Sequence, residues 1–200
     1  MKRLFFVLAT IICFSFSANA QEKQLPTNKF TTKKIENFKD NFKWDLIGCA
    51  VNDYGYLQME GKANAFSFSV PAIAATAKSL FDHNKNFKIT VNLEIKKFKA
   101  LFWIRFNSGN LVFSVAEKQF TILEMKPMRR LCLKKEKTSL NLKGDVSLSV
   151  QKEGSTLFFF YNDTLVCDAN VEVESSDIIL HLMLLNGSTE VNVKEVIIEQ

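Results

Sequence analysis

The stretch Leu148–Val166, which reads LSVQKEGSTLFFFYNDTLV, decides the fold class of this chain. Apolar and polar residues alternate up to Val150, a polar turn surrounds Gly154, and the apolar run Leu157–Tyr161 follows. The pair Asn162-Asp163 then turns the chain into another short apolar segment. Alternation bounded by Gly, Asn and Asp is typical of β-hairpins and meanders. The stretch therefore predicts antiparallel strands, although it names no chemistry.

The same pattern continues through most of the chain from Ile35 onward. Residues Ile89 to Ile95 alternate strictly between apolar and polar side chains, which is the period of a half-buried strand. Roughly eleven or twelve such segments favour a sandwich of two antiparallel sheets. We therefore predict an all-β, two-sheet jelly-roll domain over residues 35–200. Residues 71–82 are the exception, because Pro71 and several alanines favour a short helix or an ordered loop there.

The first residues, 1–20, predict a signal peptide. Lys2 and Arg3 precede the apolar run Leu4–Phe16, and small residues at Ala18-Asn19-Ala20 match the positions that a signal peptidase reads. A lipoprotein signal is the alternative, with acylation at Cys13.

The remaining chain predicts an exported protein, periplasmic or extracellular, of bacterial type. Residues 21–34 are polar and are predicted to form an N-terminal tether before the domain. No later apolar run approaches the length of about 20 residues that a membrane-spanning helix needs.

The charge of the chain is mildly basic. The formal net charge of +5 becomes +3 once Lys2 and Arg3 are removed, so no nucleic-acid partner is expected. One local run is more strongly basic and contains Lys126, Arg129, Arg130, Lys134, Lys135 and Lys137, opposed by Glu136. We interpret this run as a solvated edge strand whose lysines discourage pairing with other sheets. Contact with an anion or an acidic polysaccharide is the alternative.

Cysteine and histidine provide no metal-binding pattern. Cys49, Cys132 and Cys167 follow the predicted signal peptide, so at most one disulfide can form within the chain, and the sequence leaves open whether one does. No C-x-x-C pair is present, and His83 and His181 have no metal-ligand spacing. We expect neither a metal nor a cofactor.

Catalytic motifs are also missing from the sequence. No G-x-S-x-G nucleophile elbow and no phosphate-binding glycine loop occurs. Glycosidases need two carboxylates beside the scissile bond. Glu172 and Glu174 would share one face of a strand, but the third acid of the glucanase pattern E-x-D-x-x-E is missing, and Glu94 stands alone in its strand. We predict no catalytic residue.

The candidate binding site comes from strands that are apolar on both faces. A sheet with one face in water should alternate apolar and polar residues, and the segments around Trp103, Phe158 and His181 do not. We predict a groove lined by Trp103, Phe158 and Phe160, with Arg105 and His181 as polar groups, where aromatic faces stack on sugar rings. The alternative is that residues 71–82, or a long loop, cover this second face.

Several motifs together resemble the concanavalin A-like (laminin-G-like) jelly rolls over about residues 36–199. The resemblance is carried by Phe38-x-Asp40-x-Phe42 with Trp44, Gly55-x-Leu57, Phe87-x-Ile89-x-Val91-x-Leu93, Leu101-Phe102-x-Ile104-x-Phe106, Leu148-x-Val150 with Leu157-x-Phe159-x-Tyr161-Asn162-Asp163-x-x-Val166, and Val191-x-Val193-x-x-Val196-x-Ile198. In layout the chain is most similar to the 3-keto-disaccharide hydrolase-like domains of exported bacterial proteins. It has no counterpart of catalytic acids or metal ligands, so the resemblance implies the fold and assigns no catalytic residue.

Three functions follow as hypotheses. The first is an exported, non-catalytic module that binds a glycan or a cell-envelope partner. The second is a glycoside-active hydrolase of the same fold, and the third is a structural accessory subunit of an envelope assembly.

Overall fold

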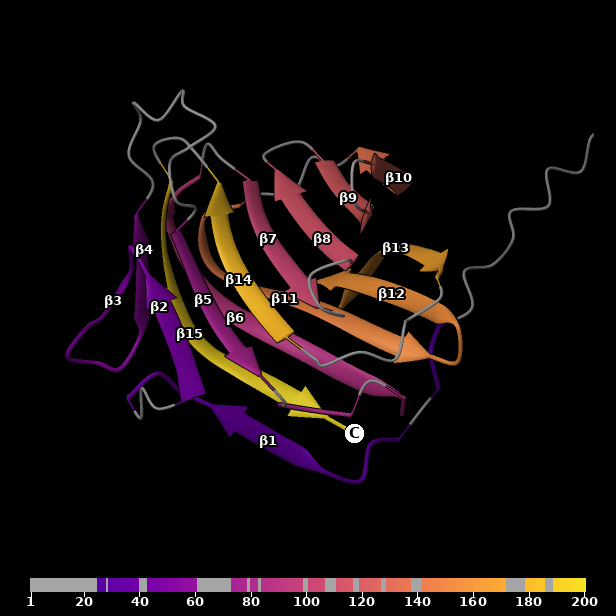
Figure 1. Cartoon of the computed structure of the whole chain (residues 1–200), viewed down its shortest axis with the longest axis horizontal. Coiled ribbons are helices and arrows are strands. Elements are labelled where there is room, and N and C mark those ends of the chain that lie inside the picture. The colour runs from indigo at the N-terminus through magenta and orange to yellow at the C-terminus, as the bar shows by residue number, and fades with distance from the viewer. Residues whose placement is uncertain are drawn as a thin grey trace, which may run out of the picture.

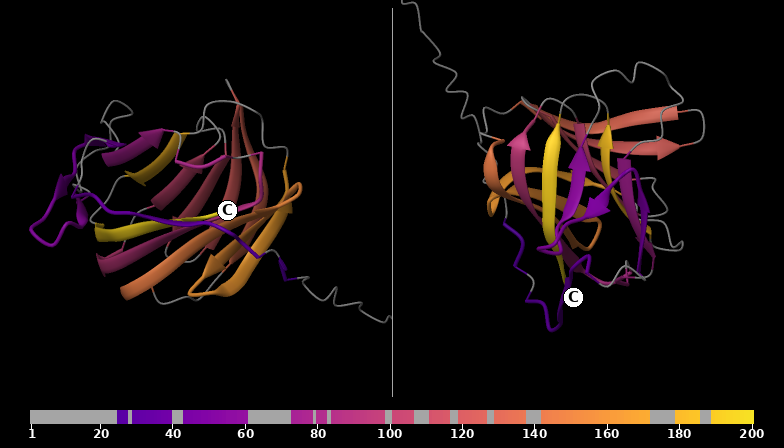
Figure 2. Two further views of the ribbon diagram at one scale, coloured as in Figure 1. Left: turned by 90° about the horizontal axis from the view of Figure 1, so that it is seen from below. Right: turned by 90° about the vertical axis from the view of Figure 1, so that its left-hand side faces the viewer.

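The chain folds into two stacked antiparallel sheets, as the computed structural model in Figures 1 and 2 shows. The structure describes residues 25–27, 29–39, 43–60, 73–78, 80–82, 84–98, 101–106, 111–116, 119–126, 129–137, 142–171, 179–185 and 189–200. Within these residues no helix has the length and apolar character needed to cross a membrane. The predicted signal peptide, His83 and the Glu172–Glu174 pair lie outside the described residues.

Among the described residues, the larger sheet has eight strands. Its order is β13 (Thr164–Asn170), β12 (Thr156–Tyr161), β11 (Gly144–Glu153), β6 (Phe87–Lys97), β15 (Glu190–Glu199), β4 (Leu57–Glu60) and β3 (Ala50–Val51), and β1 (Lys33–Glu36) also pairs with β15. The seven-stranded sheet has the order β10 (Arg129–Lys137), β9 (Gln119–Lys126), β8 (Leu111–Ala116), β7 (Leu101–Phe106), β14 (Ile179–Leu185), β5 (Ile73–Lys78) and β2 (Trp44–Ile47). The predicted all-β sandwich is therefore confirmed.

The hairpin predicted from Leu148–Val166 is formed by β11, β12 and β13. Gly154 begins the first two-residue turn with a φ of 58°, a value that a glycine adopts without strain. Asn162 and Asp163 form the second turn with φ values of 44° and 61°, so both residues have the left-handed conformation of a type I′ turn. The Asn162 side chain accepts a hydrogen bond of 2.8 Å from the Ser147 N–H, which fixes the turn against β11.

The core lies between the two sheets and is built from the inward row of each strand. In β6 the inward row consists of fully buried residues: Phe87, Ile89, Val91, Leu93 and Ile95. Aromatic rings join the two sheets, because Phe113 of β8 and Phe159 of β12 have ring centroids 4.4 Å apart. The other row of each strand faces outward, and the candidate site must therefore be sought on these outer faces.

The prediction of a helix or loop over residues 71–82 is wrong for the central part of that segment. Ile73–Lys78 is strand β5, hydrogen-bonded between β14 and β2. Alanine prefers a helix by less than about 1 kcal/mol per residue, and tertiary packing overrides that preference here. Ala75 and Ala77 are fully buried in the core, and Ala77 pairs with Trp44. This segment is therefore part of the sheet and cannot cover its second face.

The end of the predicted tether is tied to the last residue described. The backbone N–H groups of Thr31 and Thr32 donate hydrogen bonds to the Gln200 carbonyl at 2.8 and 2.7 Å. The Gln200 side chain also bonds the backbone of Asp82, accepting from its N–H and donating to its carbonyl. Residues far apart in the sequence are thus fixed together at one edge of the larger sheet, near the C label in Figure 1.

Candidate functional site

Three of the five predicted binding residues lie on neighbouring strands of the seven-stranded sheet. Arg105 and Trp103 of β7 stand opposite His181 and Met183 of β14, respectively. The residues that alternate with them, Phe102, Ile104 and Leu182, are in the core. Strand alternation therefore places the backbone positions of Trp103 and His181 in the same row as Arg105, between those core positions. Arg105 is partly buried, and desolvation lowers its pKa from the ordinary value.

The other two predicted residues lie in the opposite sheet. Phe158 and Phe160 belong to β12, and their neighbours Leu157, Phe159 and Tyr161 point into the core. The five residues therefore do not line one groove, because the sandwich separates the two outer faces. A strand sequence that is apolar on both faces does not reveal which sheet the strand joins. The prediction therefore placed residues of two different sheets in one groove.

Phe158 and Phe160 have structural partners on the outer face of their own sheet. Both are buried, and they stand opposite Gln151 and Ser149 of β11. The Lys88 ammonium lies 5.7 Å from the centre of the Phe160 ring, within the range of a cation–π contact. Both rings are thus buried and offer little exposed surface to a ligand.

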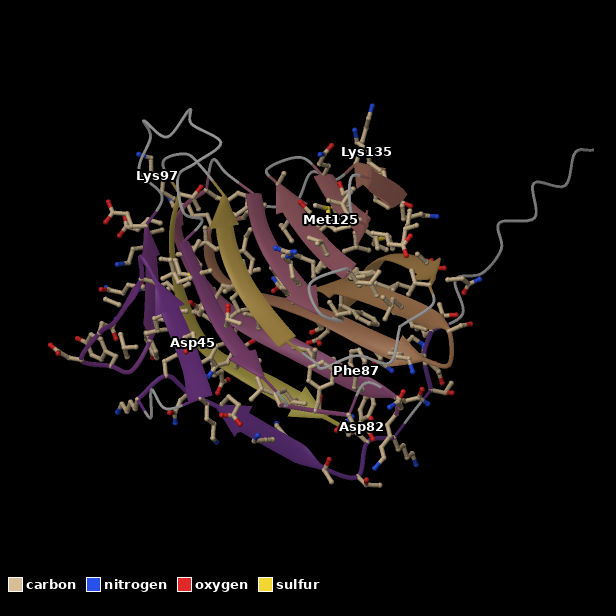
Figure 3. The ribbon with its side chains drawn as sticks, in the orientation of Figure 1. Asp45, Asp82, Phe87, Lys97, Met125 and Lys135 are labelled. Carbon is tan, nitrogen blue, oxygen red and sulfur yellow. The ribbon has the colours of Figure 1, made fainter. Side chains whose placement is uncertain are left out.

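The basic run falls on β9 and β10, and β10 is an edge strand. Lys135 and Lys137 are exposed there, and Lys134 forms an ion pair of 3.7 Å with Glu136. Figure 3 labels Lys135 at the outer border of the molecule. This position suits lysines that discourage sheet pairing, and contact with an anion stays a prediction.

Among the described residues, Cys49, Cys132 and Cys167 form no disulfide. Cys167 is buried in the core, as expected for a small apolar residue, whereas Cys132 is exposed on β10. Burial raises the pKa of the Cys49 thiol, so this cysteine is less reactive than an exposed one. No group of three or more His, Cys, Asp or Glu side chains that could hold a metal occurs among the described residues.

A different set of side chains forms a polar surface on the outer face of the eight-stranded sheet, which we call the polar face. One row crosses four adjacent strands and consists of Gln58 of β4, Asn192 of β15, Glu94 of β6 and Asp145 of β11. The next row consists of Glu195 of β15, Asn92 of β6 and Ser147 of β11. These residues come from distant parts of the sequence and meet only because of the strand order.

Reciprocal hydrogen bonds hold the two rows in place. The Asn192 amide donates to Glu94 at 2.6 Å, and the Asn92 amide donates to Glu195 at 2.8 Å. A carboxylate that accepts one hydrogen bond, and an amide that donates one, both keep further donor or acceptor capacity. The rows can therefore be rigid and still offer hydrogen bonds to a bound molecule.

A β-bulge places Lys194 over these rows. The register of β15 against β6 shifts between Val193 and Glu195, so Lys194 is the extra residue. Its ammonium donates a hydrogen bond of 2.7 Å to Asp145, two strands away, and lies 6.0 Å from the centre of the Tyr56 ring. The hydrogen bond to Asp145 is the main reason why the pKa of Lys194 is raised. The side chain is therefore a fixed positive charge at neutral pH.

A tight turn presents two tyrosines at the border of the polar face. The Asn52 side chain accepts hydrogen bonds of 3.0 Å from the N–H groups of both Tyr54 and Tyr56. Gly55 has a φ of 82°, a conformation that other residues rarely adopt. The two tyrosine rings are stacked with centroids 6.0 Å apart, and Tyr54 is 76% exposed. An exposed, oriented aromatic pair is a common feature of binding surfaces.

Two shallow hollows adjoin on the polar face, and Lys194 borders both. The first, of about 440 Å³, is lined by Asn52, Tyr54, Tyr56, Gln58, Glu94, Lys96, Asn192 and Lys194. The second, of about 410 Å³, is lined by Asn92, Leu93, Asp145, Val146, Ser147, Asn162, Lys194 and Glu195. Aromatic surface, amides, carboxylates and two lysine side chains are thus combined in one open site.

Sequence reasoning missed this site, although two signals for it were present. The spacing Val193-x-x-Val196 departs from strict alternation and marks the bulge that positions Lys194. The segment Asn52-Asp53-Tyr54-Gly55-Tyr56 combines turn residues with two aromatic residues. The assembly of the rows could not be predicted, because it depends on the strand order.

Comparison with known structures identifies the architecture. The β-glucanase of Bacillus licheniformis is similar, with a TM-score of 0.61, 7% identity, and coverage of 84% of this chain and 98% of the other. A carbohydrate-binding module, CBM66 of Bacillus subtilis, has a TM-score of 0.54 at 16% identity, covering 76% and 93%. The fold is a concanavalin A-like jelly roll. The predicted resemblance is therefore confirmed for the fold.

A third concanavalin A-like neighbour is LamA from Z. galactanivorans, solved in complex with laminaritriose and laminaritetraose. Its TM-score is 0.58 at 15% identity, and the alignment covers 86% of this chain and 100% of that one. No family model matches the sequence, and no curated protein matches it either. At these identities the similarity establishes the architecture, and function has to be argued from the site.

Proposed function

We propose that the protein is an exported, non-catalytic β-sandwich module that binds a glycan on its polar face. One observation carries the proposal: an exposed tyrosine pair borders rows of hydrogen-bonded amide and carboxylate side chains in a shallow open site. Sugars present apolar C–H faces and hydroxyl groups, so they match aromatic rings combined with planar polar groups. Fold neighbours that include a carbohydrate-binding module and a laminari-oligosaccharide complex support this ligand class.

The interactions of the two carboxylates in the site favour a binding role over catalysis. Asp145 is engaged by the Lys194 ammonium at 2.7 Å, and Glu94 accepts a hydrogen bond from Asn192. Both acids are thus held by structural partners in the site. Export is supported by the predicted signal peptide in residues 1–20.

A glycoside hydrolase is the second candidate, and one observation favours it. Glu94 and Asp145 stand directly opposite each other on β6 and β11. Cross-strand neighbours have Cβ atoms about 5 Å apart, which is compatible with the short carboxylate separation in retaining glycosidases. Release of reducing sugar from neutral polysaccharides by the wild-type protein, abolished in both Glu94→Gln and Asp145→Asn, would establish this alternative.

The test of the binding proposal is a glycan array followed by titration calorimetry on the best ligand. We expect Tyr54→Ala to weaken binding about tenfold, because it removes the exposed ring from the site. Ile47→Ala is the matched control, since Ile47 is also exposed but lies on β2 of the other sheet. If Trp103→Ala abolished glycan binding and Tyr54→Ala bound as tightly as the wild type, the site would lie on the outer face of the seven-stranded sheet. Absence of any glycan ligand, with capture of an envelope protein instead, would favour the structural accessory subunit.

A further inference from the structure

We propose that the polar face binds a neutral, linear oligosaccharide of about three sugar units, in two connected subsites on either side of Lys194. This inference rests on the proposed glycan-binding function and specifies the length and charge of the ligand. It follows from the geometry of the two hollows, from the charges that surround them and from the position of the tyrosines.

Lys194 connects the two hollows and belongs to both linings. Its ammonium contacts Asp145 in the second hollow and faces the Tyr56 ring in the first. A ligand that occupies both hollows must therefore pass over the Lys194 side chain, where the ammonium keeps N–H groups for hydroxyl acceptors.

The extent of the face sets the length of the ligand. Its polar row runs from Gln58 on β4 through β15 and β6 to Asp145 on β11. Adjacent strands are spaced by about 4.8 Å, so three spacings give a track of roughly 14 Å. That length accommodates about three sugar rings laid across the strands.

The surrounding charges select a neutral chain. Glu94, Asp145 and Glu195 line the hollows, whereas the lining cations are Lys96 and Lys194. Asp145 already neutralises Lys194, and Lys96 lies 3.4 Å from the Glu190 carboxylate. A uronic acid would place its own carboxylate beside Glu94, Asp145 or Glu195, and no unpaired lysine of the lining would balance the added charge. Neighbouring like charges repel. Hydroxyl groups carry no such penalty.

The tyrosines mark one end of the track. Tyr54 and Tyr56 lie on the turn that leads into β4, and only the first hollow includes them. A short sugar held in the second hollow, at Asp145 and Lys194, does not contact the Tyr54 ring, whereas a chain that also fills the first hollow does. Tyr54 should therefore contribute more to the binding of longer ligands than to that of short ones.

The experiment measures affinity against chain length by calorimetry. Laminaribiose, laminaritriose and laminaritetraose are the neutral probes, and an oligouronate of three units is the charged probe. For the wild type we expect about a tenfold gain from the disaccharide to the trisaccharide, little further gain with the tetrasaccharide, and at least tenfold weaker binding of the oligouronate.

Variants assign the effects to residues. Tyr54→Ala should weaken the trisaccharide and tetrasaccharide more than the disaccharide, and Lys194→Met should weaken all three neutral ligands. Ile47→Ala should match the wild type. Far-ultraviolet circular dichroism and melting curves establish that each variant is folded.

The outcomes separate this inference from the function on which it rests. If neutral ligands bind but affinity does not rise with length, if Tyr54→Ala weakens all lengths equally, or if the oligouronate binds as tightly, the subsite inference is wrong and glycan binding stands. If none of the neutral or charged oligosaccharides binds, both the proposed function and the inference are refuted for this ligand class.

Discussion

Replacing Gly55 by alanine should destabilise the protein by about 2–3 kcal/mol. Gly55 has a φ of 82°, and a left-handed conformation costs an ordinary residue about 1–2 kcal/mol. A Cβ atom at this position would also lie 2.6 Å from two carbons of the Lys39 side chain. Because Lys39 is exposed, its side chain can move away, so this contact should add only about 1 kcal/mol.

The two contributions can be measured separately. Gly144 has a φ of 79°, and a Cβ atom added there would meet nothing within 4 Å, so Gly144→Ala reports the backbone cost alone. In a Lys39→Ala background, the cost of Gly55→Ala should fall to that of Gly144→Ala, which makes a double-mutant cycle. Urea unfolding followed by fluorescence gives the free energies by linear extrapolation.

The same substitution should weaken glycan binding, because the turn positions both tyrosines through Asn52. A cost below about 0.5 kcal/mol for Gly55→Ala, or no change of that cost in the Lys39→Ala background, would refute the described turn geometry.

Other perturbations test the core, the hairpin and the buried charge. Phe159→Ala should cost about 3–5 kcal/mol in urea unfolding, because the ring is fully buried against Phe113; a cost below about 1 kcal/mol would contradict the inter-sheet contact. Asn162→Ala should lower the melting temperature more than Asn162→Gly, since its φ is 44°; the reverse order would exclude the type I′ turn. Lys152 is buried, and desolvation lowers its pKa. The stability of Lys152→Met relative to the wild type should therefore be highest at neutral pH, where the wild-type ammonium bears the full cost of desolvation. This relative stability should fall as the pH rises toward the unfolded lysine pKa of about 10.4, because the wild-type ammonium is then deprotonated; a relative stability that does not vary with pH would refute the desolvation argument.

Strands were predicted correctly where apolar and polar side chains alternate and turn residues bound the segment. The hairpin Leu148–Val166 is formed as expected, because its alternation and its Gly and Asn-Asp turns favour the same structure. The alanine-rich segment Ile73–Lys78 was predicted incorrectly, since a weak local preference for helix is overcome by pairing on both sides.

The site was harder to predict than the fold because strand order is a non-local property. Trp103 and Phe160 occur in similar apolar runs, yet they belong to opposite sheets. Conversely, Gln58, Glu94 and Asn192 are dispersed in the sequence and form one row. The sequence showed that these residues occupy the polar positions of alternating strands. The sequence of one strand, however, does not indicate which strand lies beside it.

The most direct test of glycan binding on the polar face is amide chemical-shift mapping with laminaritriose on the labelled wild-type protein. We predict that saturable shifts concentrate at the turn around Tyr54, at Asn92 and Glu94 of β6, and at Asn192 and Lys194 of β15. Shifts that concentrate instead around Trp103, Arg105 and His181, with the polar face unaffected, would contradict this placement of the site.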